Sequence, residues 1–198
     1  MTPSDPRPDR RAFLGGGLVS CLAAESLLGA EGAEGADEAR TGVVTLILVR
    51  HAEKGTDPDA PRDPGLTERG TERARTLASL LAPAGADCLV ATEYRRTRET
   101  LAPLSRATGV EVTVRPARDL EALAAELAAL PAGTVVALAG HSNTIPALVR
   151  AFGGTIDRLD EKGNLGEDEY GRLFLLPVER RPDGPARALA TIELRYGE

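Results

Sequence analysis

The stretch Val43-Val44-Thr45-Leu46-Ile47-Leu48-Val49-Arg50-His51 decides the fold class. Its first seven residues are apolar apart from Thr45, a pattern typical of a strand that is buried on both faces of a sheet. A second run of this kind covers residues 135–139 and is followed by Gly140 and His141. Strands of this type occur in parallel sheets that helices cover, so we expect both runs at the centre of such a sheet.

Helical patterns and short strands alternate along the rest of the chain. Predicted helices cover residues 66–81, 95–108, 119–130 and 143–152, and further predicted strands cover residues 88–91, 110–114, 173–178 and 188–194. Residues 153–170 form the longest predicted loop. This alternation predicts an α/β three-layer sandwich, in which a mainly parallel central sheet carries helices on both faces.

Composition excludes several classes of function. The 198 residues include only two cysteines and two histidines, too few for a disulfide-rich scaffold, a four-cysteine zinc site or a three-histidine metal site. The formal net charge of −6 and an aromatic content of 3% argue against a nucleic-acid partner. We therefore expect no metal and no cofactor.

The first forty residues resemble an export segment. Arg10 and Arg11 precede Phe13, Leu14 and a short apolar run, which is the pattern of a twin-arginine signal. The run is too short to span a membrane, for which about 20 residues are needed. Leu18-Val19-Ser20-Cys21 resembles a lipobox, so two readings stay open: a lipid anchor at Cys21, or ordinary signal cleavage.

This reading divides the chain in two. Residues 1–40 are expected to be the signal followed by a disordered spacer, and residues 41–198 the folded domain. The expected location is periplasmic or otherwise extracytoplasmic. The expected partners are the twin-arginine translocation machinery during export and, if Cys21 is lipidated, the membrane. Residues 1–40 hold four arginines and seven acids, so half of the formal charge lies outside the predicted domain.

Both histidines of the chain follow predicted central strands. Ligands of open α/β sheets bind at the carboxyl ends of the strands, so His51 and His141 are expected side by side there. Arg50 adjoins His51, and Arg96 lies near the start of the helix that follows strand 88–91. The guanidinium group matches phosphate oxygens. This edge of the sheet is therefore predicted to bind a phosphorylated small molecule.

Four motifs in order resemble the histidine phosphatase superfamily, which has the phosphoglycerate-mutase-like fold. They are Arg50-His51-Ala52-Glu53-Lys54, Leu66-Thr67-Glu68-Arg69-Gly70, the spacing of Thr92, Arg96 and Thr100, and Gly140-His141-Ser142-Asn143. The segment 169–174 is similar, more weakly, to a small exported bacterial subgroup. The resemblance implies a metal-independent phosphatase in which His51 becomes transiently phosphorylated. Arg50, Arg96 and His141 would then bind the phosphoryl oxygens.

The acid that would protonate the leaving group is not evident. Ser142 stands where the phytase-like branch of the family has an aspartate after its second histidine. Asp119 and Glu121 lie where the mutase branch has a glutamate, but an N-cap and an exposed first-turn acid explain them better. Glu53 is expected to orient its neighbours rather than to donate a proton. A missing acid would favour substrates with good leaving groups, such as anhydrides or phosphoramidates.

Three alternatives to an exported phosphatase for esters or anhydrides remain. Two are enzymes, a phosphohistidine-protein phosphatase and a phosphoglycerate-type mutase, and export argues against both. The third is a non-catalytic module that binds a phosphorylated ligand, which would not need His51.

Overall fold

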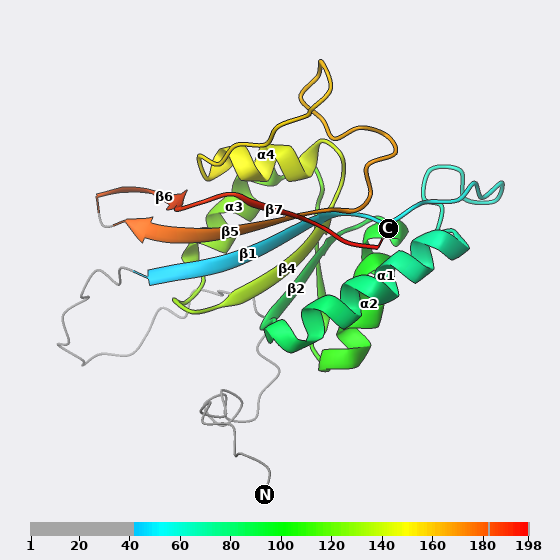
Figure 1. Cartoon of the computed structure of the whole chain (residues 1–198), viewed down its shortest axis with the longest axis horizontal. Helices are drawn as coiled ribbons and strands as arrows, with labels where there is room; N and C mark the ends of the chain where they lie inside the picture. Colours follow the sequence, from blue (N-terminus) through cyan, green and yellow to red (C-terminus); the bar gives the residue numbers. More distant parts are fainter. Residues whose placement is uncertain (1–41, 182, 198) are drawn as a thin grey trace, which may run out of the picture.

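The computed structural model describes residues 42–181 and 183–197. The predicted export segment and Cys21 therefore lie outside the described residues. Strands and helices alternate through most of the described chain, as Figure 1 shows. The strands are β1 (Gly42–Arg50), β2 (Cys88–Thr92), β3 (Val112–Arg115), β4 (Val135–Gly140), β5 (Arg172–Arg181), β6 (Gly184–Ala188) and β7 (Ile192–Arg195). The helices are α1 (Glu68–Leu81), the short 3-10 helix η2 (Ala82–Ala84), α2 (Arg95–Thr108), α3 (Leu120–Ala129) and α4 (Thr144–Ala151).

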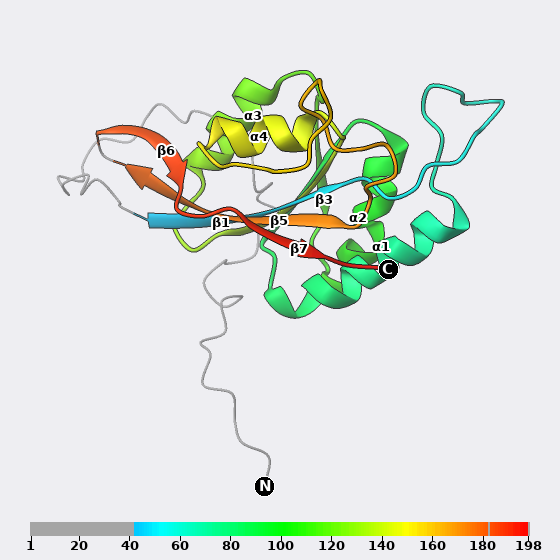
Figure 2. The ribbon, with the colours of Figure 1, turned by 45° about the horizontal axis from the view of Figure 1, so that its top comes forward.

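One mixed sheet forms the middle layer. Its strand order is β3-β2-β4-β1-β5-β6, and β7 also pairs with β5. The first four strands in this order are mutually parallel, whereas β5 runs antiparallel to β1, and β6 and β7 run antiparallel to β5. Helices α1 and α2 cover one face, and α3 and α4 cover the other (Figure 2). The predicted α/β sandwich with a mainly parallel centre is confirmed.

The central strands are buried on both faces, as their apolar runs predicted. Along β1, Leu46 and Leu48 pack with α3 and α4, while Ile47 and Val49 pack with α1 and α2. Side chains of successive strand residues point to opposite faces, so a continuous apolar run is required here. The parallel pair β1 and β4 thus forms the core on which the functional edge is built.

Most element boundaries differ from the sequence expectation by one to three residues, and two differences have a clear local cause. Helix α1 begins at Glu68 because Thr67 is its N-cap, whose hydroxyl accepts a hydrogen bond from the backbone N–H of Gly70 at 3.0 Å. The strand expected over 188–194 is interrupted: residue 188 is the last of β6, and residues 192–194 belong to β7. Val178 of β5 pairs with Ala188, and Leu175 of β5 pairs with Ile192. Four residue steps therefore lie opposite three steps of β5, so one extra residue bulges out of the ladder.

Candidate active site

The two histidines lie side by side at the carboxyl edge of the sheet. Arg50 pairs with Gly140 in the β1–β4 register, so His51 and His141 each come one residue beyond that pair. The backbone N–H of His51 donates to the carbonyl of Gly140 at 2.9 Å, which continues the ladder past the last strand pair. The ring centroids are 5.4 Å apart. The sheet itself therefore fixes the separation of the two rings.

The ring of His51 is held in the form that a nucleophile needs. Its Nδ1 lies 2.8 Å from the carbonyl oxygen of Ala52, an acceptor, so Nδ1 carries the proton and Nε2 keeps its lone pair. Burial, with a smaller effect of the neighbouring Arg50, lowers the pKa of His51 to about 3. The ring is therefore neutral near pH 7, and Nε2 can attack a phosphorus atom.

The motif Thr92, Arg96, Thr100 connects the two histidines. Nε2 of His141 lies 2.9 Å from the Thr92 hydroxyl, and Arg96 Nη2 lies 3.4 Å from Nδ1 of the same ring. Because the guanidinium group can only donate, Nδ1 is the acceptor and Nε2–H donates to Thr92. Thr100 accepts from the backbone N–H of Ala52 at 2.9 Å, which fixes the backbone beside the nucleophile. All three residues of this spacing therefore act on the histidine pair.

The two arginines expected to bind phosphate are only partly satisfied; Arg50 is buried, and Arg96 is 14% exposed with Asp63 at 3.8 Å. Nε of Arg50 and Nε of Arg96 have no hydrogen-bond partner among the described residues, although both atoms are buried. Each guanidinium group stacks at 4.3 Å on an aromatic ring, Tyr170 for Arg50 and Tyr94 for Arg96. Each guanidinium group therefore keeps hydrogen-bonding capacity that the described protein atoms do not use. Phosphoryl oxygens are acceptors that suit the guanidinium fork.

A cavity of about 420 Å³ opens over this group. Its lining comprises Arg50, His51, Lys54, Tyr94, Arg96, Ala117, Arg118, His141, Ser142, Asn143 and Thr144. Four of these side chains are cationic and none is a carboxylate. Helices α2 and α4 begin at the cavity, and neither N-cap residue, Tyr94 or Asn143, makes a side-chain capping bond. Cations and helix N-termini together favour an anionic ligand.

The candidate acids lie outside this cavity. Asp119 is the N-cap of α3, where its carboxylate accepts from the backbone N–H of Ala122 at 3.4 Å. Glu121 is exposed in the first turn of the same helix. Neither residue lines the cavity, in agreement with the structural interpretation that the sequence favoured.

Glu53 is also engaged elsewhere. Its carboxylate receives two hydrogen bonds from Arg73 Nε, at 2.9 and 3.0 Å, and one from Arg73 Nη2 at 2.8 Å. Burial raises the pKa of Glu53, but the bonds from Arg73 outweigh it, and the net pKa is lowered. A carboxylate held ionised in this way is a poor proton donor. It anchors the segment after His51 to helix α1.

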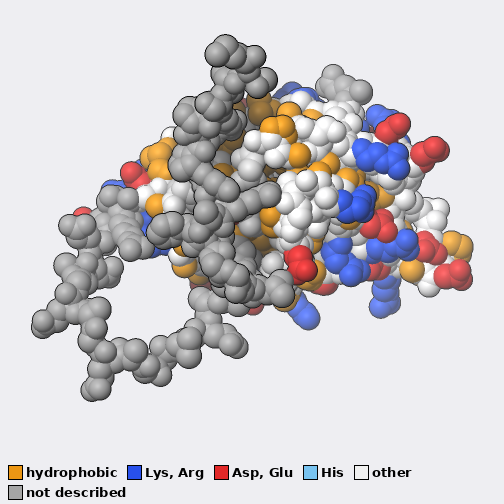
Figure 3. Space-filling view, turned by 90° about the horizontal axis from the view of Figure 1, so that it is seen from below, with side chains coloured by type: hydrophobic (Ala, Val, Ile, Leu, Met, Phe, Trp, Pro, Cys, Tyr) orange, Lys and Arg blue, Asp and Glu red, His pale blue; other side chains and the backbone are white. Residues whose placement is uncertain are grey.

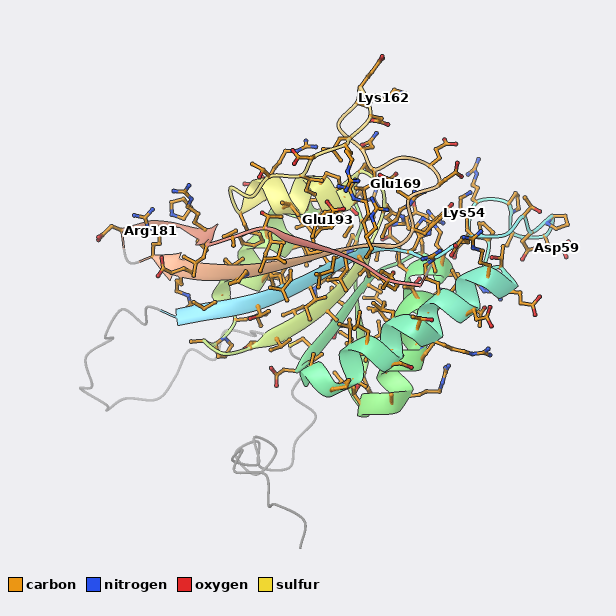
Figure 4. The ribbon with its side chains drawn as sticks, in the orientation of Figure 1. Lys54, Asp59, Lys162, Glu169, Arg181 and Glu193 are labelled. Carbon is orange, nitrogen blue, oxygen red and sulfur yellow. The ribbon has the colours of Figure 1, made fainter. Side chains whose placement is uncertain are left out.

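Arg50 is held from the opposite side by the loop 153–170. Its Nη1 donates to the carbonyls of Gly166 and Glu167 at 2.6 and 2.8 Å. Glu169, labelled in Figure 4, accepts from the backbone N–H of Gly166 at 3.4 Å and pairs with Arg172 at 3.0 Å. Arg172 is fully buried.

Arg172 joins this loop to the last strand. Its Nη2 reaches Glu193 Oε2 at 2.8 Å and the carbonyl of Asp157 at 2.7 Å. The result is a continuous chain of hydrogen bonds from β7 through the loop to Arg50. Sequence reasoning did not identify this arrangement, nor the cavity residues Lys54, Tyr94 and Arg118. The signal for Arg118 was its place directly after a parallel strand, the same argument that identified the histidines.

The described residues contain neither a metal-binding cluster nor a membrane-spanning helix. Within residues 42–181 and 183–197, no group of three or more histidine, cysteine or acidic side chains is placed to hold a metal ion. In the same residues no helix is both long and apolar enough to cross a membrane.

Comparison with known proteins finds one matching family profile and structures of similar fold. Residues 46–119 match the profile of the histidine phosphatase superfamily (branch 1). No curated protein sequence matches the chain significantly. A structure from Nakamurella multipartitia, assigned as a phosphohistidine phosphatase SixA, shares 26% identity with a TM-score of 0.55, over 78% of this chain and 97% of that one.

Two more distant structures show the same fold. The protein histidine phosphatase SixA complexed with tungstate is 15% identical, with a TM-score of 0.58, over 76% of this chain and 96% of that one. A mycobacterial glucosyl-3-phosphoglycerate phosphatase is 19% identical, with a TM-score of 0.54, over 70% of this chain and 91% of that one. The profile match and the shared fold confirm the resemblance of this domain to the histidine phosphatase superfamily.

Proposed function

We propose that this protein is a metal-independent phosphatase that hydrolyses phosphate esters or anhydrides through a phosphohistidine intermediate on His51. One observation carries the proposal. The lone pair of His51 Nε2 is free because Nδ1 donates to Ala52, and the ring lines a cavity together with Arg50 and Arg96, whose Nε atoms have no partner among the described residues. A nucleophile and a set of oxyanion donors in one cavity are what in-line phosphoryl transfer requires.

The reaction has two steps. In the first, Nε2 of His51 forms a bond to phosphorus while the bond to the leaving group breaks. Arg50 and Arg96 bind the equatorial oxygens and offset their negative charge, and His141, a neutral ring hydrogen-bonded to Thr92 and Arg96, positions Arg96 beside them. In the second, water attacks the phosphorus of the phosphohistidine and orthophosphate is released. Two successive displacements replace one that is harder.

The absence of a carboxylate in the cavity lining restricts the substrate. An alkyl ester leaves as an alkoxide unless an acid donates a proton to it. We therefore expect fast hydrolysis of substrates whose leaving group is stable without a proton, such as aryl phosphates and anhydrides.

The experiment is a hydrolysis screen over aryl phosphates, alkyl phosphates and anhydrides, with a chelator present throughout. His51→Ala should abolish turnover and the acid-labile phosphate label on the protein. Asn164→Ala, which changes a side chain outside the cavity lining, should leave both unchanged. Turnover that survives in His51→Ala, that the chelator stops, or that is equally fast with alkyl and aryl phosphates would contradict the proposal.

A second candidate is a phosphohistidine-protein phosphatase. The observation in its favour is that no carboxylate lines the cavity. The leaving group of a phosphohistidine is an imidazole, which can take a proton from solvent and leave as a neutral molecule, so it needs no acid from the protein. The SixA-type structure at 26% identity points the same way. Adding a phosphohistidine protein to the screen tests it: a kcat/KM well above that for aryl phosphates is the expected result.

Export is proposed on the first forty residues alone. The paired Arg10 and Arg11 and the short apolar run support transport by the twin-arginine machinery. Cell fractionation of the full chain should find the protein outside the cytoplasm, and replacing both arginines by lysine should retain it inside. Radiolabelled fatty acid incorporated by the wild type but not by Cys21→Ser would support a lipid anchor.

A further inference from the structure

Two cationic side chains that line the cavity, Lys54 and Arg118, have no assigned contact with the phosphoryl group. Lys54 is the last residue of the His51 motif, and Figure 4 labels it where the chain leaves β1 for the loop 55–65. Arg118 lies between β3 and α3. Both line the same cavity as His51, from two separate segments of the chain.

What sets these two side chains apart is their place in the cavity. Among the exposed cations, Arg95 and Arg158 reach a carboxylate at 2.7 and 2.9 Å, whereas Arg75 and Arg98 form an ion pair with no described carboxylate. On the face that carries α1 and α2, acidic and basic side chains lie side by side (Figure 3). Lys54 and Arg118 have no ion pair with any described carboxylate. Positive charge is therefore left unbalanced in the cavity.

The unbalanced charge exceeds what one phosphoryl group needs. The two positive charges of Arg50 and Arg96 already match the charge of a phosphoryl dianion. Lys54 and Arg118 add two positive charges, and like charges in one cavity repel unless an anion lies between them. The volume of about 420 Å³ also falls within the range of about 300–1,000 Å³ typical of small-molecule sites, and a single phosphoryl group does not fill it.

We propose that Lys54 and Arg118 form a second anion subsite, so that the preferred substrate is a phosphoanhydride, with a second phosphate attached to the phosphoryl group that is transferred. This inference rests on the proposed function and names the substrate class of the same site. It also explains why the cavity can act without a carboxylate in its lining. A phosphate leaving group needs its negative charge to be stabilised, but it does not need a proton.

The step balances without an added reactant. The lone pair of His51 Nε2 forms the N–P bond, the bridging P–O bond breaks, and its electron pair stays on the oxygen of the departing phosphate. Lys54 and Arg118 stabilise the charge that develops on this oxygen. Water then attacks phosphorus, the N–P bond breaks, and the proton of the attacking water passes to solvent.

The test compares an anhydride with a monoester in the same variants of the full chain. Inorganic diphosphate and p-nitrophenyl phosphate serve as substrates, with a chelator present. Lys54→Met and Arg118→Gln should each lower kcat/KM for diphosphate about tenfold, which is the size of one charged contact, and change kcat/KM for the monoester less than about twofold. The matched control is Arg98→Gln, an exposed cation of α2 outside the cavity lining, which should change neither.

The outcomes separate this inference from the proposed function. If both substrates lose activity equally in the variants, or if the wild type does not prefer diphosphate, the second subsite is refuted while the phosphatase proposal stands. If the wild type hydrolyses neither substrate, both are refuted. Inhibition of monoester hydrolysis by diphosphate gives a second readout, and its inhibition constant should rise about tenfold in either variant.

Discussion

Replacing Arg172 by methionine should destabilise the domain and weaken its active site together. Arg172 is fully buried and pairs with Glu169 and Glu193 at 3.0 and 2.8 Å. Removing one partner of a buried ion pair costs about 3–5 kcal/mol, because the other charge remains unpaired. The two carboxylates keep 27% and 24% of their side-chain exposure, so water compensates them in part, and we expect about 3 kcal/mol.

Urea unfolding followed by circular dichroism measures this loss. A loss of about 3 kcal/mol leaves a domain of about 5–15 kcal/mol folded, with a Tm lower by about 6–12 °C. The matched control is Arg195→Met, because Arg195 contacts the same carboxylates at 3.5 and 3.8 Å but is 40% exposed. Exposed pairs contribute about 0–1 kcal/mol, so the control should change little. Equal losses in the two variants would refute the reasoning.

The same pair of variants predicts a pH dependence. Hydrogen bonds from Arg172 lower the pKa of Glu193; for Glu169, burial raises the pKa, and Arg172 outweighs it. Groups with lowered pKa add stability above the usual glutamate pKa of about 4.3, and the contribution is lost as the pH falls through their folded values. The stability difference between wild type and Arg172→Met should therefore be largest near pH 7 and shrink below about pH 4. A difference that grows on acidification would contradict this assignment.

Three further predictions concern the histidine pair and its support. The chain has only two histidines, so proton NMR resolves both rings. Neither ring should titrate between pH 5 and 8, because burial lowers the pKa of His51 to about 3 and that of His141 to about 4. A titration midpoint near pH 6.5 in the folded protein would contradict this. Thr92→Val removes the acceptor of His141 and should lower kcat about tenfold, whereas the exposed Thr76→Val should not. Gly70→Ala places a methyl group against the backbone of Glu53 and should lower the free energy of unfolding in urea by at least about 2 kcal/mol. Full wild-type stability would mean that helix α1 and the segment around Glu53 move apart easily.

The core of the fold and the centre of the site could be predicted from sequence because local rules determine both. Strand β1 is buried on both faces, and a continuous apolar run is the only pattern that fits such a strand. His51 and His141 follow the two central strands, so the parallel register brings them together once the strands are recognised. Arg96 lies in the same cavity because its helix begins at the same edge.

Features that depend on long-range contacts could not be predicted. Arg172 interacts with Glu193 across 21 positions and, through the loop, supports Arg50 more than 100 positions away. No periodic pattern of hydrophobic residues in the sequence indicates which distant side chains pair. The break between β6 and β7 was missed because a bulge depends on how many residues the partner strand supplies opposite it. Lys54 was missed because a charged side chain in a loop has the same sequence signal whether it lines a cavity or faces solvent.

The hydrogen bond from the backbone N–H of His51 to the carbonyl of Gly140 has a consequence for local motion. Many enzymes place reactive residues on segments that open far more readily than the rest of the chain. Here the amide of the reactive residue belongs to the central parallel ladder, so it can exchange with deuterium only when that ladder opens. We expect its protection to approach that of the core amides of β1, with the adaptable parts of substrate recognition confined to the surrounding loops. Loop sequences could then change widely without altering the spacing of the two imidazole rings.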